Sequence, residues 1–142
     1  MVNKSANHST YNTHYHIVFP VKYRKALLST KHDKAILEIS KKIEERYDIE
    51  FENIGTDGDH IHILCSFKPS YKGSEVVKKI KSITARELFR QFLELRKELW
   101  GGELWSDGYY FATVGEGGNL STIKKYIKNQ GKTKTTTQLR LF

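Results

Sequence analysis

A short segment near the middle of the chain constrains the fold more than any other. It reads Asp-His-Ile-His-Ile-Leu-Cys over residues 59–65, so polar and apolar side chains alternate along most of it. In a β-strand, successive side chains point to opposite faces of the sheet. We therefore expect Ile61 and Ile63 to face a hydrophobic core. His60 and His62 should lie side by side on the other face, where two imidazoles are able to bind one metal ion.

The spacing of these two histidines does not by itself establish a metal site. Two surface or hydrogen-bonded histidines would give the same pattern, and His14 and His16 repeat the spacing in an earlier segment. Asp59, directly before the first histidine, is a candidate for orienting the neighbouring imidazole through a hydrogen bond. An ordinary role in the turn at residues 57–59 explains that aspartate equally well.

Hydrophobic periodicity predicts an alternation of strands and helices around this segment. The expected strands cover residues 11–21, 49–54, 59–68 and 105–114, and the expected helices cover 31–47, 75–98 and 120–130. Thr30 is the expected N-cap of the first helix, with Asp33 three residues later as in a capping box. The first six elements give a ferredoxin-like βαββαβ antiparallel sheet of the α+β class, followed by an extra C-terminal helix. In that fold the histidine strand is central.

Length and composition predict one globular domain over residues 1–142, with 1–10 and 132–142 as flexible tails. Hydrophobic residues make up 38% of the chain, which excludes a disordered protein. Cys65 is the single cysteine, which excludes an intramolecular disulfide and favours a reducing compartment. We see neither a signal peptide nor an apolar run of about 18 residues. We therefore expect a cytoplasmic protein without a membrane partner.

The net charge of +8 favours a polyanionic partner, and nucleic acid is the preferred interpretation. A solvated basic surface would give the same charge. An anionic membrane is the third option, but the chain lacks a basic amphipathic helix with an aromatic apolar face. The candidate DNA contacts, chosen on charge and position, are Lys22, Arg24, Lys78, Lys79 and Lys81. The cluster at residues 22–25 also contains a tyrosine, a composition that binds phosphates while it stacks a base, although an ordinary surface turn fits it equally well.

The last expected helix carries a second group of chemically useful side chains. Tyr126 and Gln130 are four residues apart, so they lie one above the other on the helix. Lys124, Lys125 and Lys128 surround the tyrosine, and positive neighbours favour the phenolate, which is a nucleophile. The Gln130 carbonyl oxygen is a possible metal ligand. Taken alone, the pattern fits a tyrosine packed on the sheet and a solvated glutamine better.

Taken together and in order, these motifs resemble a known family. His60-Ile61-His62 is similar to the His-hydrophobe-His signature of HUH single-strand nucleases. Tyr126 with Gln130 resembles the catalytic helix of their single-tyrosine transposases. Residues 15–19 and 22–24 are similar to the first strand of that family and the residues after it. The chain therefore resembles the small insertion-sequence transposases that act on single-stranded DNA.

The resemblance implies a chemistry and its partners. His60, His62 and Gln130 would bind one divalent cation, Mg²⁺ or Mn²⁺, which acts as a Lewis acid on the scissile phosphate. Tyr126 would attack that phosphate, leaving a 5′-phosphotyrosine and a free 3′-OH that allows later rejoining. Proteins of this family are homodimers that recognise single-stranded DNA hairpins near the ends of the insertion sequence.

Two other functions remain compatible with the same fold. A non-catalytic ferredoxin-like nucleic-acid-binding module would bind without metal and form no covalent adduct. The aromatic residues Tyr109, Tyr110 and Phe111 leave that option open. An HUH replication initiator or relaxase tends to be larger and often carries two tyrosines on the helix, whereas Tyr126 is the only tyrosine on this one. A domesticated relative of a transposase also fits.

Overall fold

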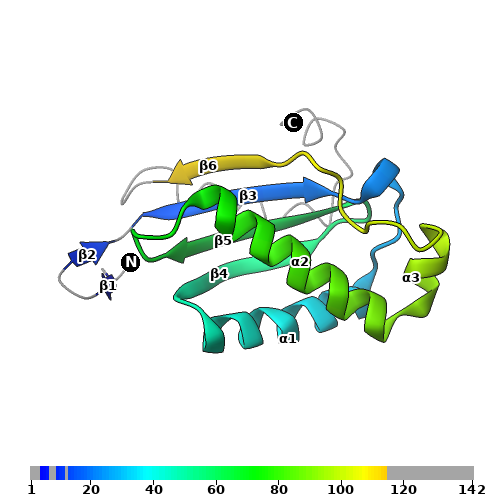
Figure 1. Cartoon of the computed structure of the whole chain (residues 1–142), viewed down its shortest axis with the longest axis horizontal. Coiled ribbons are helices and arrows are strands. Elements are labelled where there is room, and N and C mark those ends of the chain that lie inside the picture. Colours follow the sequence, from blue (N-terminus) through cyan, green and yellow to red (C-terminus); the bar gives the residue numbers. More distant parts are fainter. Residues whose placement is uncertain (1–3, 7–8, 12, 115–142) are drawn as a thin grey trace.

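The computed structural model describes residues 4–6, 9–11 and 13–114. Its main feature is a four-stranded antiparallel sheet with helices on one face (Figure 1). In chain order the strands are β3 (His14–Pro20), β4 (Ile49–Thr56), β5 (His60–Phe67) and β6 (Tyr110–Val114). Their order across the sheet is β4-β5-β3-β6, which confirms the predicted ferredoxin-like arrangement with the histidine strand β5 in the centre. The helix predicted over residues 120–130 lies outside the described residues.

The two central strands pair in a register that creates the core. Ile17 lies opposite Ile63, and Phe19 lies opposite Ile61. Residues directly opposite each other in an antiparallel pair share a face of the sheet. All four of these side chains are fully buried. The pairing therefore presents one continuous apolar surface to the helices.

Helices α1 (Thr30–Arg46) and α2 (Gly73–Gln91) cover that apolar surface. Their buried residues recur at the three- and four-residue spacing of an amphipathic helix. The main ones are Ile36, Ile39 and Ile43 of α1, and Val77, Ile80 and Leu88 of α2. Both helices thus bury one stripe against the sheet and leave their charged faces outward. Among the described helices, none is long and apolar enough to cross a membrane.

The first helix begins at Thr30, one residue earlier than predicted, and its capping residues are different. The N-cap is Ser29, whose backbone N–H donates a hydrogen bond to Nδ1 of His32 at 2.9 Å. Asp33, the residue expected to complete the capping box, instead accepts hydrogen bonds from Thr56. Its Oδ1 lies 2.9 Å from the Thr56 backbone nitrogen and 2.6 Å from the Thr56 hydroxyl. The carboxylate therefore joins the start of α1 to the end of β4.

The prediction of a single helix over residues 75–98 is wrong, because the helix is interrupted at Phe92. This residue has φ −129° and ψ 87°, and it separates α2 from the short helix α3 (Leu93–Glu98). The Phe92 ring packs edge-on against the His32 imidazole at 4.7 Å between centroids. After the break, Leu95 is buried in the core. A tertiary contact with α1 thus accompanies the end of a helix whose local sequence would continue.

The last predicted strand, over residues 105–114, is also too long. Only its second half forms β6, while Trp105 makes an isolated bridge with Val21. The ammonium group of Lys81 donates to the carbonyl oxygen of Ser106 at 2.6 Å. This contact ties the segment between the bridge and β6 to α2, so that segment does not extend the strand.

The N-terminal residues, expected to be a flexible tail, include a short hairpin. Strands β1 (Lys4–Ala6) and β2 (Ser9–Tyr11) pair in antiparallel fashion and form a sheet separate from the main one. The pairing gives these residues regular secondary structure, and the flexibility of residues 1–10 stays a prediction. The other predicted tail, residues 132–142, lies outside the described part of the chain.

A buried hydrogen bond anchors the Trp105 segment to α2. The indole Nε1–H donates to Oγ1 of Thr84 at 2.9 Å, and the same hydroxyl lies 2.7 Å from the carbonyl oxygen of Ile80. Both side chains are buried, and the indole also packs edge-on against Phe19 at 4.9 Å. The Thr84 hydroxyl is thus donor and acceptor at once.

Replacing Thr84 with Val should destabilise the fold, because valine keeps the side-chain shape but leaves the indole N–H buried without its acceptor. We expect the free energy of unfolding to fall by about 1–3 kcal/mol, measured by urea denaturation. Thr84→Ser retains the hydroxyl and is the matched control. A Val variant as stable as the Ser variant would show that this hydrogen bond contributes nothing measurable.

Candidate active site

The sheet face opposite α1 and α2 carries four histidines. His14 and His16 come from β3, and His60 and His62 come from β5. The predicted alternation along β5 is observed, since the residues between the histidines belong to the core. All four imidazole-bearing residues are at most 7% exposed. The sequence showed the two-residue spacing within each pair but not that the pairing of β3 with β5 would bring both pairs to one face.

The two histidines of β5 lie on the same face of the strand, but their rings are not in contact. The ring centroids of His60 and His62 lie 6.5 Å apart, with 58° between the ring planes. Two imidazoles on one tetrahedral ion have centroids about 5 Å apart, given nitrogen–metal distances of about 2.1 Å. The observed separation of the two rings is larger than that, so metal ligation by this pair stays a prediction. Among the described residues, no group of three or more His, Cys, Asp or Glu side chains is placed to hold a metal.

Asp59 contacts His60 in the way expected of an orienting residue. Its Oδ1 lies 3.0 Å from Nδ1 of the imidazole. A carboxylate at Nδ1 favours the tautomer with the proton on that nitrogen, so Nε2 becomes the nitrogen suited to a metal. The contact considered from the sequence is thus present, and its part in metal binding stays a prediction.

The His62 imidazole lies against the backbone of β4 at Gly55. These two residues are directly paired across the strands. A Cβ atom placed on Gly55 would lie 3.1 Å from Cε1 of the imidazole and 3.3 Å from its Nε2. The glycine therefore leaves the space that the ring occupies. The sequence analysis missed Gly55, and the available signal was a glycine inside a strand, which often marks a close approach.

Burial keeps two of these histidines neutral. Desolvation, together with the neighbouring imidazoles of His60 and His16, lowers the pKa of His62 to about 3. Desolvation also lowers the pKa of His16 to about 4. A neutral imidazole offers a lone pair, whereas a protonated one repels a cation. At neutral pH this face of the sheet is therefore chemically suited to metal ligation.

The depressed pKa of His16 predicts a loss of stability in acid. The unfolded chain binds a proton near the ordinary pKa of 6.5, while the folded chain binds it only near 4, so stability falls as the pH drops between these values. By about pH 4 the contribution should approach ~3 kcal/mol. A His16→Leu variant, followed by urea denaturation at several pH values, should lose correspondingly less than the wild type. Equal losses in both proteins would show that His16 titrates normally when folded.

The basic residues selected from the sequence lie in two separate regions. Lys22 and Arg24 belong to the short 3-10 segment η1 (Lys22–Arg24), which follows β3 at the end of the sheet where His60 begins β5. Lys78 and Lys79 belong to α2 and line a hollow on the helix-covered side. The structure therefore does not bring these two lysines together with the histidines.

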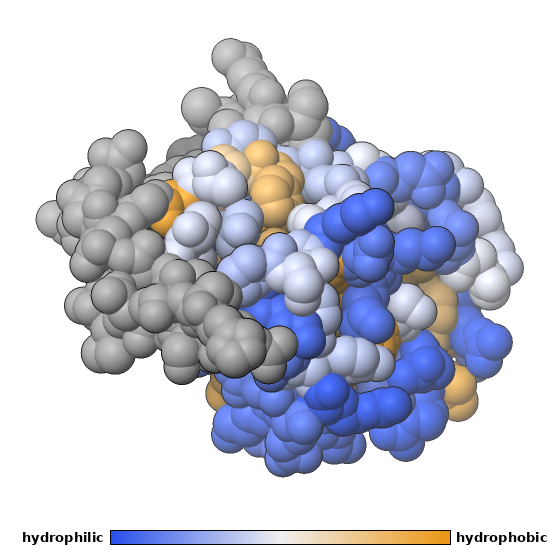
Figure 2. Space-filling model, turned by 60° about the vertical axis from the view of Figure 1, so that its left-hand side comes forward, coloured by the Kyte–Doolittle hydropathy of each residue, from blue (hydrophilic) through white to orange (hydrophobic). Residues whose placement is uncertain are grey.

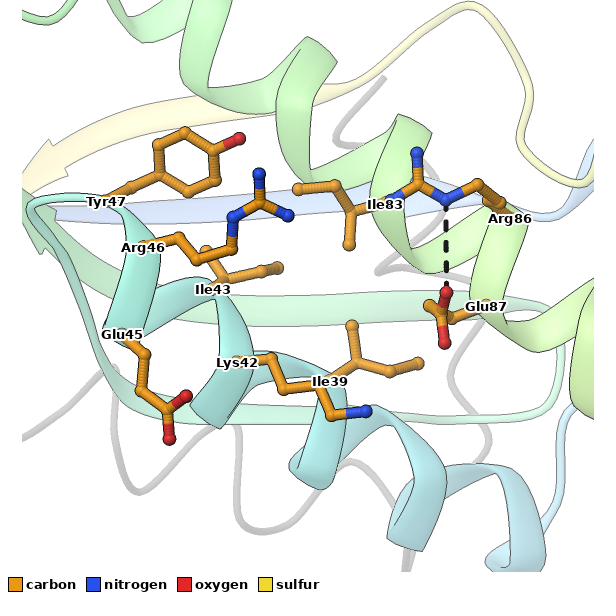
Figure 3. Close-up of a pocket in the computed structure, with 9 residues that line it drawn as sticks. All are labelled: Ile39, Lys42, Ile43, Glu45, Arg46, Tyr47, Ile83, Arg86 and Glu87. Carbon is orange, nitrogen blue, oxygen red and sulfur yellow. Dashed lines mark ion pairs between the residues drawn. The ribbon is translucent and has the colours of Figure 1, made fainter.

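The hollow with Lys78 and Lys79 is part of a basic groove between α1 and α2. One portion, of about 340 Å³, is shown in Figure 3, and an adjoining portion of about 470 Å³ shares Arg46, Tyr47, Ile83 and Arg86 with it. The ammonium group of Lys79 lies 4.2 Å from the Tyr47 ring centroid. The cations lining the two portions are Lys42, Arg46, Lys78, Lys79 and Arg86, against the carboxylates Glu45, Glu75 and Glu87.

The described surface in Figure 2 is largely hydrophilic, with apolar residues in separate small areas. Together with the excess of cations in the groove, this surface suits a charged partner better than an apolar one.

Lys81 has a different environment from the other selected lysines. Besides the contact with Ser106, its ammonium group donates to the carbonyl oxygens of Asp107 at 3.1 Å and Gly108 at 3.4 Å. Burial lowers its pKa. In this position the side chain holds a loop, and contact with DNA stays a prediction. Tyr126 and Gln130 lie outside the described residues.

Comparison with known proteins identifies the family to which the chain belongs. Residues 9–130 match the family model described as "Transposase IS200 like". The chain belongs to the IS200-like transposase family. Its activity is accordingly that of a transposase, an enzyme that cuts DNA, which favours this function over a non-catalytic binding module.

Individual IS200-like transposases are similar over most of their length. The ISDra2 transposase TnpA of Deinococcus radiodurans is 32% identical over 120 residues, which are 84% of this chain and 85% of the relative. The transposase for insertion sequence element IS200 of Salmonella typhimurium is 33% identical over 127 residues, which are 89% of this chain and 82% of the relative.

Solved structures of IS200-like and related transposases share the fold. A crystal structure described as that of a transposase from Deinococcus radiodurans R1 gives a TM-score of 0.71 at 29% identity, covering 89% of this chain and 97% of the other. A REP-associated tyrosine transposase bound to a REP hairpin gives a TM-score of 0.60 at 12% identity, covering 89% and 72%. The second likeness concerns the fold alone.

Proposed function

We propose that this transposase cuts and rejoins single-stranded DNA at the ends of an insertion sequence through a 5′-phosphotyrosine intermediate. The observation that carries the proposal is the pair His60 and His62, buried side by side on the sheet face away from the helices. The family match extends to residue 130 and so includes Tyr126 and Gln130.

His60, His62 and Gln130 are the proposed ligands of one divalent cation, Mg²⁺ or Mn²⁺. Two imidazole ligands favour Mn²⁺ over Mg²⁺, which prefers oxygen. A bound cation supplies Lewis-acid polarisation of the scissile phosphate. Asp59 fixes the tautomer and direction of His60, and Gly55 leaves the space for the His62 ring.

Tyr126 is the proposed nucleophile. Its phenolate oxygen bonds to the scissile phosphorus, and the bond from that phosphorus to the 3′ oxygen breaks. One DNA end then carries a free 3′-OH, and the other is attached to the tyrosine through its 5′ phosphate. Because the new linkage is still a phosphodiester, a 3′-OH is able to attack it in reverse and rejoin DNA without ATP. The lysines at 124, 125 and 128 favour the phenolate.

The proposed partner is a single-stranded DNA hairpin, bound by a homodimer. A related structure contains a REP hairpin, and the basic residues described above are suited to phosphate contacts that position DNA. Each chain carries one proposed nucleophile, so cutting two ends of an element requires two chains. Lys22, Arg24, Lys78 and Lys79 are the proposed contacts, with Lys81 as a further candidate.

The central test is covalent capture of single-stranded DNA. Labelled single-stranded hairpin DNA from the ends of the element, incubated with protein and Mn²⁺, should give a protein–DNA adduct on a denaturing gel. Tyr126→Phe removes the nucleophilic oxygen and should abolish the adduct. An adduct of wild-type yield in this variant would disprove the assignment.

Matched histidine variants separate catalysis from binding in the same assay. His60→Ala and His62→Ala should lose cleavage while they retain most of their hairpin affinity. Equal loss of binding, together with hairpin binding that survives EDTA in the wild type, would favour a non-catalytic binding module.

The close approach at Gly55 predicts a way to disturb the proposed metal site without touching a ligand. In Gly55→Ala the added methyl group would press on the His62 ring, which should weaken Mn²⁺ binding and cleavage by about tenfold or more. Mn²⁺ titration by electron paramagnetic resonance measures the affinity, and a thermal melt checks the fold. Gly108→Ala is the matched control, because nothing lies within 4 Å of its Cβ position. Equal Mn²⁺ affinity in the two variants would show that the His62 ring accommodates the methyl group and that metal binding does not depend on Gly55.

A further inference from the structure

The turn after β3 has an unusual backbone. Tyr23 has φ 60° and ψ 14°, and Arg24 has φ 53°. Two successive residues other than glycine therefore adopt the left-handed region, which is disfavoured for side chains with a Cβ atom. Such strain persists where the surrounding structure fixes it, and it is concentrated at functional sites.

Hydrogen bonds to two other segments hold this turn in place. The Val21 N–H donates to the carbonyl of Asp59 at 2.7 Å, and the Lys22 N–H donates to that of Leu104 at 2.8 Å. Within the turn, the Arg24 N–H donates to the carbonyl of Val21 at 2.8 Å. The strained conformation is thus built into the end of the sheet and is not an isolated loop.

The fixed turn displays an aromatic ring among cations. The Tyr23 side chain is 68% exposed, although a tyrosine ring is largely apolar. The ammonium group of Lys22 lies 5.8 Å from the ring centroid. Burial does not explain why the chain holds this ring in a strained position, so a binding role is the more economical reason.

A second exposed aromatic side chain lies near the same turn. Trp100 is 81% exposed and also has a positive φ, 52°. The ammonium group of Lys25 lies 4.8 Å from its ring centroid and donates to the carbonyl of Glu98 at 2.9 Å. The turn and the loop after α3 lie at the same end of the sheet in Figure 1. The Lys25 side chain therefore connects the turn that carries Tyr23 with the loop that carries Trp100.

This end of the sheet is also where the histidine strand begins. Pro20 lies opposite His60, and Tyr23 follows Pro20 by only three residues. Three residues of chain span at most about 11 Å. Tyr23 is therefore within reach of nucleotides near a phosphate held at His60, and Lys25 of the same turn contacts the Trp100 ring.

We propose that Tyr23 and Trp100 form a stacking site for unpaired nucleobases beside the scissile phosphate. Aromatic side chains among cations are the usual means of holding single-stranded nucleic acid, because every base has a face to stack and every linkage carries a negative charge. Lys22, Arg24 and Lys25 supply the positive charge. The placement beside the scissile phosphate rests on the proposed function, whereas stacking itself requires no cleavage.

The test measures affinity for a short oligothymidylate that carries one 2-aminopurine, whose fluorescence changes on stacking. Tyr23→Ala and Trp100→Ala should each weaken binding about tenfold, within the range measured for single aromatic stacking contacts. Tyr23→Phe should bind like the wild type, because it keeps the ring. Leu37→Ala is the control, because it also removes an exposed apolar side chain, 48% exposed, but lies within α1 and offers no ring for stacking.

A glycine variant separates binding from folding. Tyr23→Gly removes the ring and also relieves the strained φ, so it should melt at or above the wild-type temperature while it loses oligothymidylate affinity like the Ala variant. Weak binding together with a lower melting temperature in this variant would contradict the proposal. Wild-type affinity in either the Ala or the Gly variant would overturn it.

Duplex DNA and the adduct assay distinguish the remaining outcomes. Stacking needs unpaired bases, so affinity for a blunt duplex should change little in Tyr23→Ala. An equal loss for duplex and single strand would overturn the stacking site in favour of a general charge effect or a partner of another kind.

If the wild type forms no covalent adduct but the Tyr23 variants still lose single-strand affinity, stacking stands and the cleavage proposal fails. If adducts form normally and these variants bind like the wild type, only the stacking site fails.

Discussion

The pairing of β3 with β5 is the contact on which the rest of the structure depends. Its register places Ile17 opposite Ile63 beneath the helices and Val18 opposite His62 on the other face. A slip of one residue would exchange the two faces, burying imidazoles in the apolar core and exposing isoleucines. The hydrophobic effect that favours this register therefore also places the histidines on one face, and the contacts with Asp59 and Gly55 then fix the positions of two of the rings.

Much of the fold was predictable because its signals are local. Alternation over residues 59–65 and helical periodicity over 31–47 depend only on neighbours in sequence, and the order of elements then limits the topology. The break at Phe92 was not predictable, since no glycine or proline marks it. It coincides with a contact between the Phe92 ring and His32, which are far apart in sequence. The cap at Ser29 was missed for a similar reason, because Asp33 bonds to a strand rather than to its own helix.

In the candidate site, too, local sequence identified some residues, whereas others depend on contacts between strands. His60, His62 and Asp59 were identifiable because they are adjacent in one strand and the turn before it. The contact between Gly55 and His62, and the shared face with His16, depend on which residues of neighbouring strands lie opposite each other. Sequence spacing does not give that information. The roles of Tyr126 and Gln130 come from the resemblance and the family match, since both residues lie outside the described part of the chain.

The glycine beneath the His62 ring has a consequence for the natural history of such chains. Mobile elements accumulate damaged copies, and a copy that keeps both histidines still looks intact when only its signature motif is inspected. A bulkier residue at position 55 would crowd the imidazole while leaving that motif unchanged. Under the proposed metal site, we therefore expect the residue at position 55 to be informative about such copies in addition to the two histidines.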